Sequence, residues 1–275
     1  MKTPVLTFLL LFFALTSFAQ FSVEASLGAG LPTSGRYRIA GTTSTIGGIN
    51  TVSNTINRLS FGPGIRGGFT GLYQFPSGFG FGLEAHWFQS TTARVEEFAT
   101  SDRARFSDFS STSYRLYPHI YFQMPTLSKI EPFARMGVVL GFNTIDEEVF
   151  SDLNLTTINI SRTYQGGMSI GYQMKVGAIY QLNERLGIFS EIFLLAMVWS
   201  GEERVVNSAF QDGVDLLPTL TSDQINAPIL ETVTLEVDQP FDPFFPDQIL
   251  REAFHYTTFG LSVGVRYTFG RETDD

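Results

Sequence analysis

The chain has no cysteine and only three histidines among its 275 residues. The lack of cysteine excludes disulfide bonds, a lipid-modified N-terminal cysteine and thiolate metal ligands. The histidines show no metal-ligand spacing, so we expect neither a metal site nor a cofactor.

Long apolar segments and basic residues are also scarce. After residue 20 the most hydrophobic run is Ile192 to Trp199, far shorter than the roughly 20 residues of a membrane helix. Any membrane-spanning structure must therefore be a closed β-barrel, because only helices and closed barrels satisfy all backbone hydrogen bonds in lipid. Charged residues make up 16%, with 18 basic against 27 acidic, so nucleic acid is not an expected partner.

Residues 1–19 are predicted to be a secretion signal peptide. Lys2 gives a short basic start, Val5 to Phe13 form an apolar run, and Ser17-Phe18-Ala19 places small residues where a signal peptidase reads them. A retained membrane helix is the alternative, but the apolar run is too short for it. Cleavage after Ala19 leaves residues 20–275, with a formal charge of 17 − 27 = −10.

The remaining chain repeats an alternation of apolar with small or polar residues eight times. In the last copy, Phe259 to Phe269, every odd position is apolar and every even position is Gly, Ser, Thr or Arg. This period of two predicts β-strands with unlike faces. The predicted strands cover about residues 21–31, 59–75, 79–87, 114–124, 134–142, 168–180, 188–198 and 259–269.

The polar faces of these strands carry Arg, Lys, Glu and His, and the chain is predicted to be exported. This combination predicts an all-β fold, a transmembrane antiparallel up-and-down β-barrel of eight strands. The long connections cover residues 32–57, 90–111, 143–161 and 200–255, and we expect them to be extracellular loops, with both termini periplasmic. Ile229 to Val237 also alternates, which is consistent with a β-hairpin that extends beyond the membrane, and ten strands are the alternative if this segment enters the lipid.

The short connections predict the register of three hairpins. Hairpins centred on residues 77, 128 and 184 bring inward residues opposite one another, and a slip of one residue would break all three. The predicted pairs are Glu84 with Thr70, His119 with Gly137, and Glu191 with Gly177.

Two further expectations concern single residues in the predicted strands. Pro118 lies within the fourth strand and lacks an N–H donor, so a bulge or local break is expected there. Outward aromatic residues such as Phe61 and Trp87 are expected to form a girdle near the long loops.

Three segments carry a resemblance to a known family. They are Phe18-Ala19-Gln20 at the signal end, Glu131-Pro132-Phe133-Ala134-Arg135, and the terminal Val263-Gly264-Val265-Arg266-Tyr267-Thr268-Phe269. With the glycine-spaced strands, they resemble the small outer-membrane β-barrel family, of the OmpA-like or PorT-like kind, over nearly the whole mature chain. The resemblance implies the outer membrane of a Gram-negative-type bacterium and insertion by the barrel assembly machinery, which reads an aromatic terminal strand. Here Gly270 to Asp275 follow that strand, so the signal is slightly internal.

The inward residues are predicted to form a charge network in the lumen. An eight-stranded barrel is filled by its own side chains, which favours internal ion pairs over a conducting pore. Lys175 is expected diagonal to Glu191, and Arg66 diagonal to His86. The ten residues of this lumen network are Glu24, Arg66, Glu84, His86, Arg115, His119, Arg135, Lys175, Glu191 and Arg266.

No catalytic site is predicted, and we expect that the protein is not an enzyme. Barrel lipid A deacylases resemble the chain in size and use a His and a Ser two positions apart, but no histidine here is followed by Ser at that spacing. An omptin-like protease would need an Asp and His pair at the extracellular rim, where His255 and the acidic loops supply only loose candidates.

The segment 200–255 is the candidate binding loop. It carries eleven acidic residues against two arginines, a net charge of −9, and three phenylalanines that no membrane strand buries. Exposed aromatic residues of this kind mark partner sites, and divalent cations could bridge the carboxylates to anionic glycolipid. The predicted loop site consists of Asp238, Phe241, Asp242, Phe244, Phe245 and Asp247.

These features predict an outer-membrane protein with a structural or interaction role through its loops. Its expected partners are outer-membrane lipid and lipopolysaccharide, the barrel assembly machinery, and a protein at the extracellular loops. A small channel or an uptake or secretion accessory component is the main alternative, and a membrane hydrolase is the other. The fold alone does not decide among these roles, because one fold hosts many functions.

Overall fold

The structure is a computed structural model that describes residues 20–32, 36–46, 49–99, 103–124, 128–153, 156–230, 249–250 and 253–269. The predicted signal peptide and the predicted loop site at Asp238 to Asp247 lie outside the described residues. Within the described ranges, no helix is both long and apolar enough to cross a membrane.

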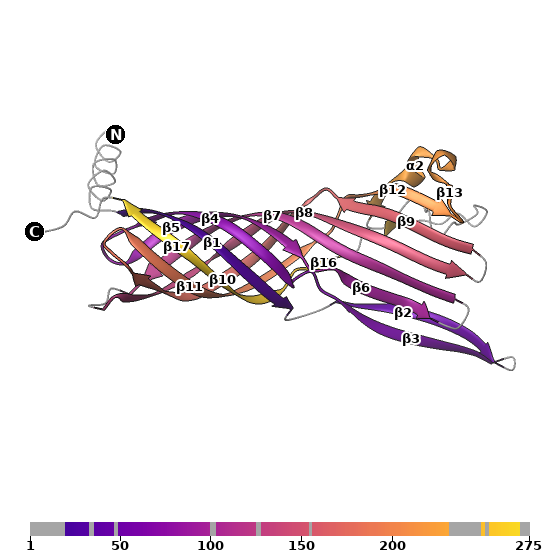
Figure 1. Cartoon of the computed structure of the whole chain (residues 1–275), viewed down its shortest axis with the longest axis horizontal. Coiled ribbons are helices and arrows are strands. Elements are labelled where there is room, and N and C mark those ends of the chain that lie inside the picture. Colours follow the sequence, from indigo (N-terminus) through magenta and orange to yellow (C-terminus); the bar gives the residue numbers. More distant parts are fainter. Residues whose placement is uncertain are drawn as a thin grey trace, which may run out of the picture.

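Eight antiparallel strands close into a barrel (Figure 1). Each barrel strand pairs with the next one along the chain, and the last also pairs with the first. The fold class predicted from the sequence is therefore confirmed, with eight strands in the barrel wall. These strands are β1 (Gln20–Pro32), β4 (Gly64–Gln74), β5 (Phe79–Ser90), β7 (Arg103–Gln123), β8 (Ile130–Leu153), β10 (Met168–Gln181), β11 (Leu186–Trp199) and β17 (Thr258–Phe269).

The register of the three short hairpins is as predicted. Each predicted pair of inward residues is present in the ladders β4–β5, β7–β8 and β10–β11. The pattern of unlike faces is strong enough to fix the register, because a slip of one residue would turn every side chain to the opposite face.

Strands continue past one end of the barrel. β7 and β8 have 21 and 24 residues, and their outer halves continue the same sheet beyond the barrel as an open part between β6 and β9 (Figure 1). We call this the extension sheet, and the opposite end of the barrel the turn end. Besides β7 and β8, the extension sheet contains β6 (Ala93–Ala99), β9 (Thr156–Gln165), β12 (Glu203–Gln211), β13 (Val214–Asp215), β14 (Asn226–Leu230) and β15 (Ile249–Leu250).

Smaller elements complete the described structure. β2 and β3 form a separate antiparallel hairpin, β16 pairs with β11, and η1 and α2 follow β13. Their bounds are β2 (Arg36–Ile46), β3 (Ile49–Leu59), β16 (Phe254–His255), η1 (Leu217–Thr219) and α2 (Ser222–Ile225).

The ranges expected to be loops thus contain paired strands. β2 and most of β3 lie in 32–57, β6 and the start of β7 in 90–111, the end of β8 in 143–161, and β12 to β16 in 200–255. The second barrel strand also begins later than expected. It starts at Gly64, and the predicted start at Leu59 is instead the end of β3.

Pro118 causes a local break without a bulge. The β7–β8 register is the same on both sides of it, with Leu116 opposite Leu140 and His119 opposite Gly137, but Tyr117 and Pro118 have no partner in that ladder. On its other side Pro118 stays opposite Leu83 of β5. Because proline cannot donate a backbone hydrogen bond, the interruption is confined to one edge of the strand.

The expectation that Phe61 joins an outward girdle is wrong. Phe61 is buried, and its ring lies 5.7 Å from that of Phe254 and 5.5 Å from that of Tyr256. Since Phe61 precedes the start of β4, the alternation of the strand does not determine its direction. It packs into the barrel mouth instead of facing outward.

Candidate functional site

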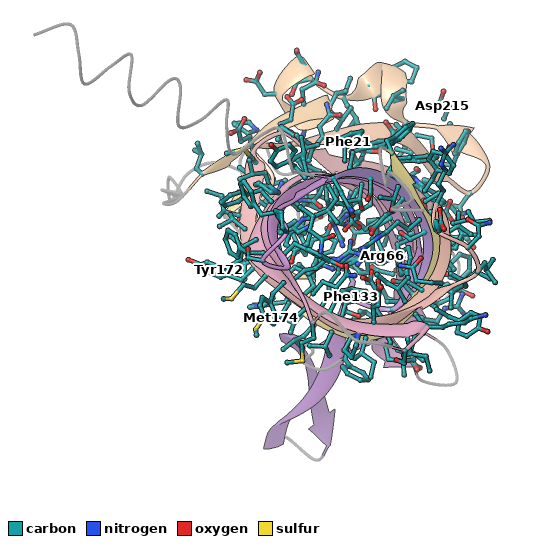
Figure 2. The ribbon with its side chains drawn as sticks, turned by 90° about the vertical axis from the view of Figure 1, so that its left-hand side faces the viewer. Phe21, Arg66, Phe133, Tyr172, Met174 and Asp215 are labelled. Carbon is teal, nitrogen blue, oxygen red and sulfur yellow. The ribbon has the colours of Figure 1, made fainter. Side chains whose placement is uncertain are left out.

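The outer surface of the barrel is apolar on every strand. On β10, Tyr172 and Met174 are 69% and 54% exposed, and Figure 2 shows both pointing away from the barrel while Arg66 and Phe133 point into it. Leu261 and Val263 of β17, near the middle of the strand, are exposed in the same way. An apolar surface of this extent on a protein requires an apolar environment or partner.

The height of this surface agrees with the thickness of a lipid bilayer. On β10 the exposed apolar positions run from Met168 to Tyr180. Twelve steps of about 3.3 Å give roughly 40 Å along the strand. At the tilt of about 40° that is typical of barrels, this corresponds to about 30 Å along the axis, close to the hydrocarbon thickness.

On β7 and β8 the apolar surface ends at one cross-strand level, that is, at one pair of directly opposite residues. Tyr114 and Phe142 lie opposite each other and are both exposed, and the next outward pair toward the extension sheet is Thr112 with Thr144. Ser110 with Asp146 and Asp108 with Glu148 follow in the same direction. The same face of two continuous strands therefore changes from apolar to polar.

Inside the barrel, Glu84 is the centre of one ion cluster. Its Oε1 accepts a hydrogen bond of 2.6 Å from Arg66 Nη2, and its Oε2 accepts one of 2.5 Å from Lys175 Nζ. Lys175 Nζ also donates to Glu191 Oε1 at 2.8 Å, so the expected Lys175–Glu191 pair is present. The partner of Arg66 is Glu84 rather than His86, whose Nδ1 lies 3.4 Å from Glu84 Oε1.

Glu24 holds a second cluster closer to the turn end. Arg135 Nη1 and Arg266 Nη2 approach its two carboxylate oxygens to 2.7 and 2.6 Å. Arg135 Nε also lies 3.9 Å from Glu191 Oε2, which joins the two clusters. All the side chains in both clusters are nearly inaccessible to solvent, so their charges are balanced by one another and not by bulk water.

The remaining members of the predicted lumen network are also buried. Arg115 donates from Nε to Ser113 Oγ at 2.8 Å, and its guanidinium lies 4.3 Å from the centre of the Phe88 ring. His119 stacks on Tyr117 at 4.6 Å between ring centres. The structure thus brings all ten predicted residues into one interior, although only seven of them form the two ion clusters, with His86 beside the first.

Apolar clusters lie on both sides of these charges. At the turn end, a cluster contains Leu72, Tyr121, Phe133, Ile179 and Phe189. At the mouth, the larger cluster includes Phe61, Phe109, Trp199, Phe254 and Tyr256. The interior therefore has a charged middle between two layers of aromatic and aliphatic side chains.

The inner face of the extension sheet carries a buried charged group that the sequence analysis missed. Glu147 of β8 accepts a hydrogen bond of 2.8 Å from the Tyr164 hydroxyl, and its Oε2 lies 3.5 Å from Arg162 Nη1. Burial and the nearby Glu147 raise the pKa of Tyr164 above its ordinary value. Burial and the nearby Arg162 lower the pKa of Arg204 to about 10.

A continued alternation was the signal that could have revealed this inner face. Beyond Phe142 the buried residues continue at a spacing of two, but the outward residues Thr144, Asp146 and Glu148 are polar. The buried residues are Asn143, Ile145, Glu147, Val149 and Ser151. Within the part of the chain that the structure describes, no group of three metal-ligating side chains is found.

The geometry defines a class of protein, a closed eight-stranded antiparallel barrel with an apolar exterior and a charged interior. No described protein family and no curated protein sequence matches the chain. Among solved structures it is similar to the outer membrane protein OprG from Pseudomonas aeruginosa, at 12% identity and a TM-score of 0.44, covering 91% of this chain and 96% of that one.

Two further crystal structures show a weaker similarity. For the Neisserial surface protein A the identity is 13% and the TM-score 0.38, covering 90% of this chain and 97% of that one. For a major outer membrane protein from Thermus thermophilus the values are 14% and 0.38, covering 91% and 99%. Similarities of this size do not indicate the role of this chain, and the fold rests on the strand pairing itself.

Proposed function

We propose that the protein is an integral outer-membrane barrel that anchors the extension sheet at the cell surface, where the sheet serves as an interaction surface. One observation carries the proposal: the outer face of β7 and β8 changes from apolar to polar at a single cross-strand level while the strands continue. Lipid explains the apolar part, and water or a hydrated partner explains the polar part. The termini and short turns then lie in the periplasm, and β17 offers its aromatic end to the assembly machinery.

The same proposal includes a lumen that is closed to ions. Support comes from the paired charges in the middle of the interior and from the clusters of aromatic and aliphatic side chains on both sides of them. We expect no steady current when the purified protein is inserted into a planar bilayer, because a narrow, filled lumen leaves no continuous water. Stable unitary conductance would support the small-channel alternative instead.

The absence of native cysteine allows a direct test of the topology. Val214→Cys places a thiol on the extension sheet, and Ser77→Cys places one in an exposed turn at the opposite end. A membrane-impermeant maleimide should label the Val214→Cys protein on intact cells, whereas the Ser77→Cys protein should react only after the cells are opened. The reverse pattern would show that the barrel is inserted the other way round.

A further inference from the structure

Two adjacent rows of unlike chemistry cross the outer face of the extension sheet. Within each row, every residue lies directly opposite the next one on the neighbouring strand. The polar row is Arg94, Asp108, Glu148, Ser161 and Ser208. The aromatic row, one step farther from the barrel, is Phe106, Phe150, Asn159 and Phe210.

A depression of about 360 Å³ lies where the two rows meet on β7, β8 and β9. The Phe106 and Phe150 rings stack at 4.9 Å between centres with 26° between planes. The Arg94 guanidinium lies 4.5 Å from the Phe106 ring centre and donates two hydrogen bonds, of 2.7 and 2.6 Å, to Asp108. Phe106 on β7 is therefore in contact with Arg94 from β6 on one side and with Phe150 from β8 on the other, and Phe150 borders the depression.

The chemistry of the depression fits a sugar ring. A sugar ring presents apolar C–H groups on its faces and hydroxyl groups around its edge, so it needs a flat aromatic surface beside hydrogen-bonding groups. The face of the Phe150 ring that is not stacked on Phe106 supplies the first and remains partly exposed, while Glu148, Asn159 and Ser161 supply the second. A concave site with an aromatic floor and a few convergent polar groups is typical of a binding site for a small molecule.

The charge around the depression selects against acidic ligands. The single cation of the polar row, Arg94, is already paired with Asp108, and Glu148, Asp146 and Asp152 are exposed on the same face. We therefore propose that the depression binds a neutral saccharide ring. Sulfated, phosphorylated or sialylated sugars would face uncompensated carboxylates there.

The position of the depression indicates where the saccharide comes from. Phe106 lies on the same face of β7 as the lipid-facing Tyr114, eight residues away. That separation is about 25 Å along the strand, or about 20 Å above the apolar surface at a typical barrel tilt. Because the depression lies on the outer face of the sheet, on the side that faces lipid in the barrel below, the ligand we propose is the sugar chain of glycolipids in the same leaflet. This step rests on the membrane location proposed above.

The test uses the full-length protein, refolded in nanodiscs. Neutral hexose oligosaccharides and sulfated oligosaccharides are titrated by calorimetry, and a neutral glycolipid is added to the nanodisc lipid in a separate series. Phe150→Leu keeps an apolar side chain in the strand but removes the flat ring. Val214→Ala is the matched control, because Val214 is exposed on the same sheet outside the depression.

We expect neutral oligosaccharides to bind and Phe150→Leu to weaken binding at least tenfold, with Val214→Ala unchanged. The neutral glycolipid should compete with the free oligosaccharide. Binding of sulfated sugars only, or equal binding by Phe150→Leu, would overturn the saccharide site, and failure of the glycolipid to compete would overturn its proposed source. If the protein enters nanodiscs but binds no sugar, only this inference fails. If it does not enter nanodiscs, the proposed membrane role fails as well.

Discussion

Glu84→Gln is the substitution that tests the charged interior most directly. Glu84 is fully buried and contacts both Arg66 and Lys175, whereas Lys175 has Glu191 as a second partner. The substitution therefore leaves Arg66 as a buried cation without a carboxylate. Removing one partner of a buried pair costs about 3–5 kcal/mol, and we expect the lower end because glutamine keeps hydrogen-bonding capacity. A loss of about 3 kcal/mol lowers the folding equilibrium constant roughly 100-fold.

A second substitution separates this effect from a general loss of packing. Arg66→Met removes the stranded cation and keeps an apolar stem over Phe193, whose ring lies 4.4 Å from the guanidinium. The double variant should therefore be more stable than Glu84→Gln alone, by about 1 kcal/mol or more. Simple addition of the two single losses would refute the proposed pairing.

The assay is equilibrium urea unfolding of the protein in lipid vesicles, followed by tryptophan fluorescence. Trp199 is buried at the barrel mouth, so its emission reports the closed state of the interior. A Glu84→Gln protein that unfolds at the same urea concentration as the parent, with the same dependence on urea, would show that this carboxylate does not balance the interior charges.

Two further predictions concern the outer face. Brominated lipid should quench the fluorescence of Trp87, which is exposed on the barrel wall, and leave the fluorescence of Trp199 almost unaffected. Similar quenching of both tryptophans would contradict the assigned inward and outward faces. Leu261→Arg should destabilise the protein in vesicles by about 2–4 kcal/mol because it places a charge near the middle of the lipid, as measured by urea unfolding. Leu261→Ala is its control, and tolerance of arginine equal to that of alanine would show that this face does not contact lipid.

The barrel could be predicted from the sequence because its two faces meet different media. Residues such as Glu84, Lys175 and Glu191 alternate with apolar residues, so their burial and register follow from the period of two alone. Phe61 illustrates the limit of this reasoning. It lies before the strand begins, and its direction is set by the aromatic residues around it, which come from distant parts of the chain.

Apart from a β-hairpin considered at Ile229 to Val237, the extension sheet was not predicted, because the inward and outward sides of the alternation are exchanged there. In the barrel the apolar residues face outward, but on β8 the outward residues from Thr144 to Glu148 are polar, while the apolar Ile145 and Val149 face inward. A search of the sequence for strands with apolar residues on their outward face therefore stops at Thr144. The depression at Phe150 could not be predicted either, since its residues come from strands whose pairing there lies entirely beyond the barrel.

The continuity of β7 and β8 has a mechanical consequence. No hinge separates the extension sheet from the barrel wall along these two described strands, because both pass from one to the other with their pairing register unchanged. A pull on the sheet along the barrel axis meets these strands at a typical tilt of about 40°, so the larger part of the force runs along them. It loads many interstrand hydrogen bonds at once, since those bonds lie across the strand direction. Traction on a ligand at the proposed site would be resisted in shear along these strands and passed to the barrel wall.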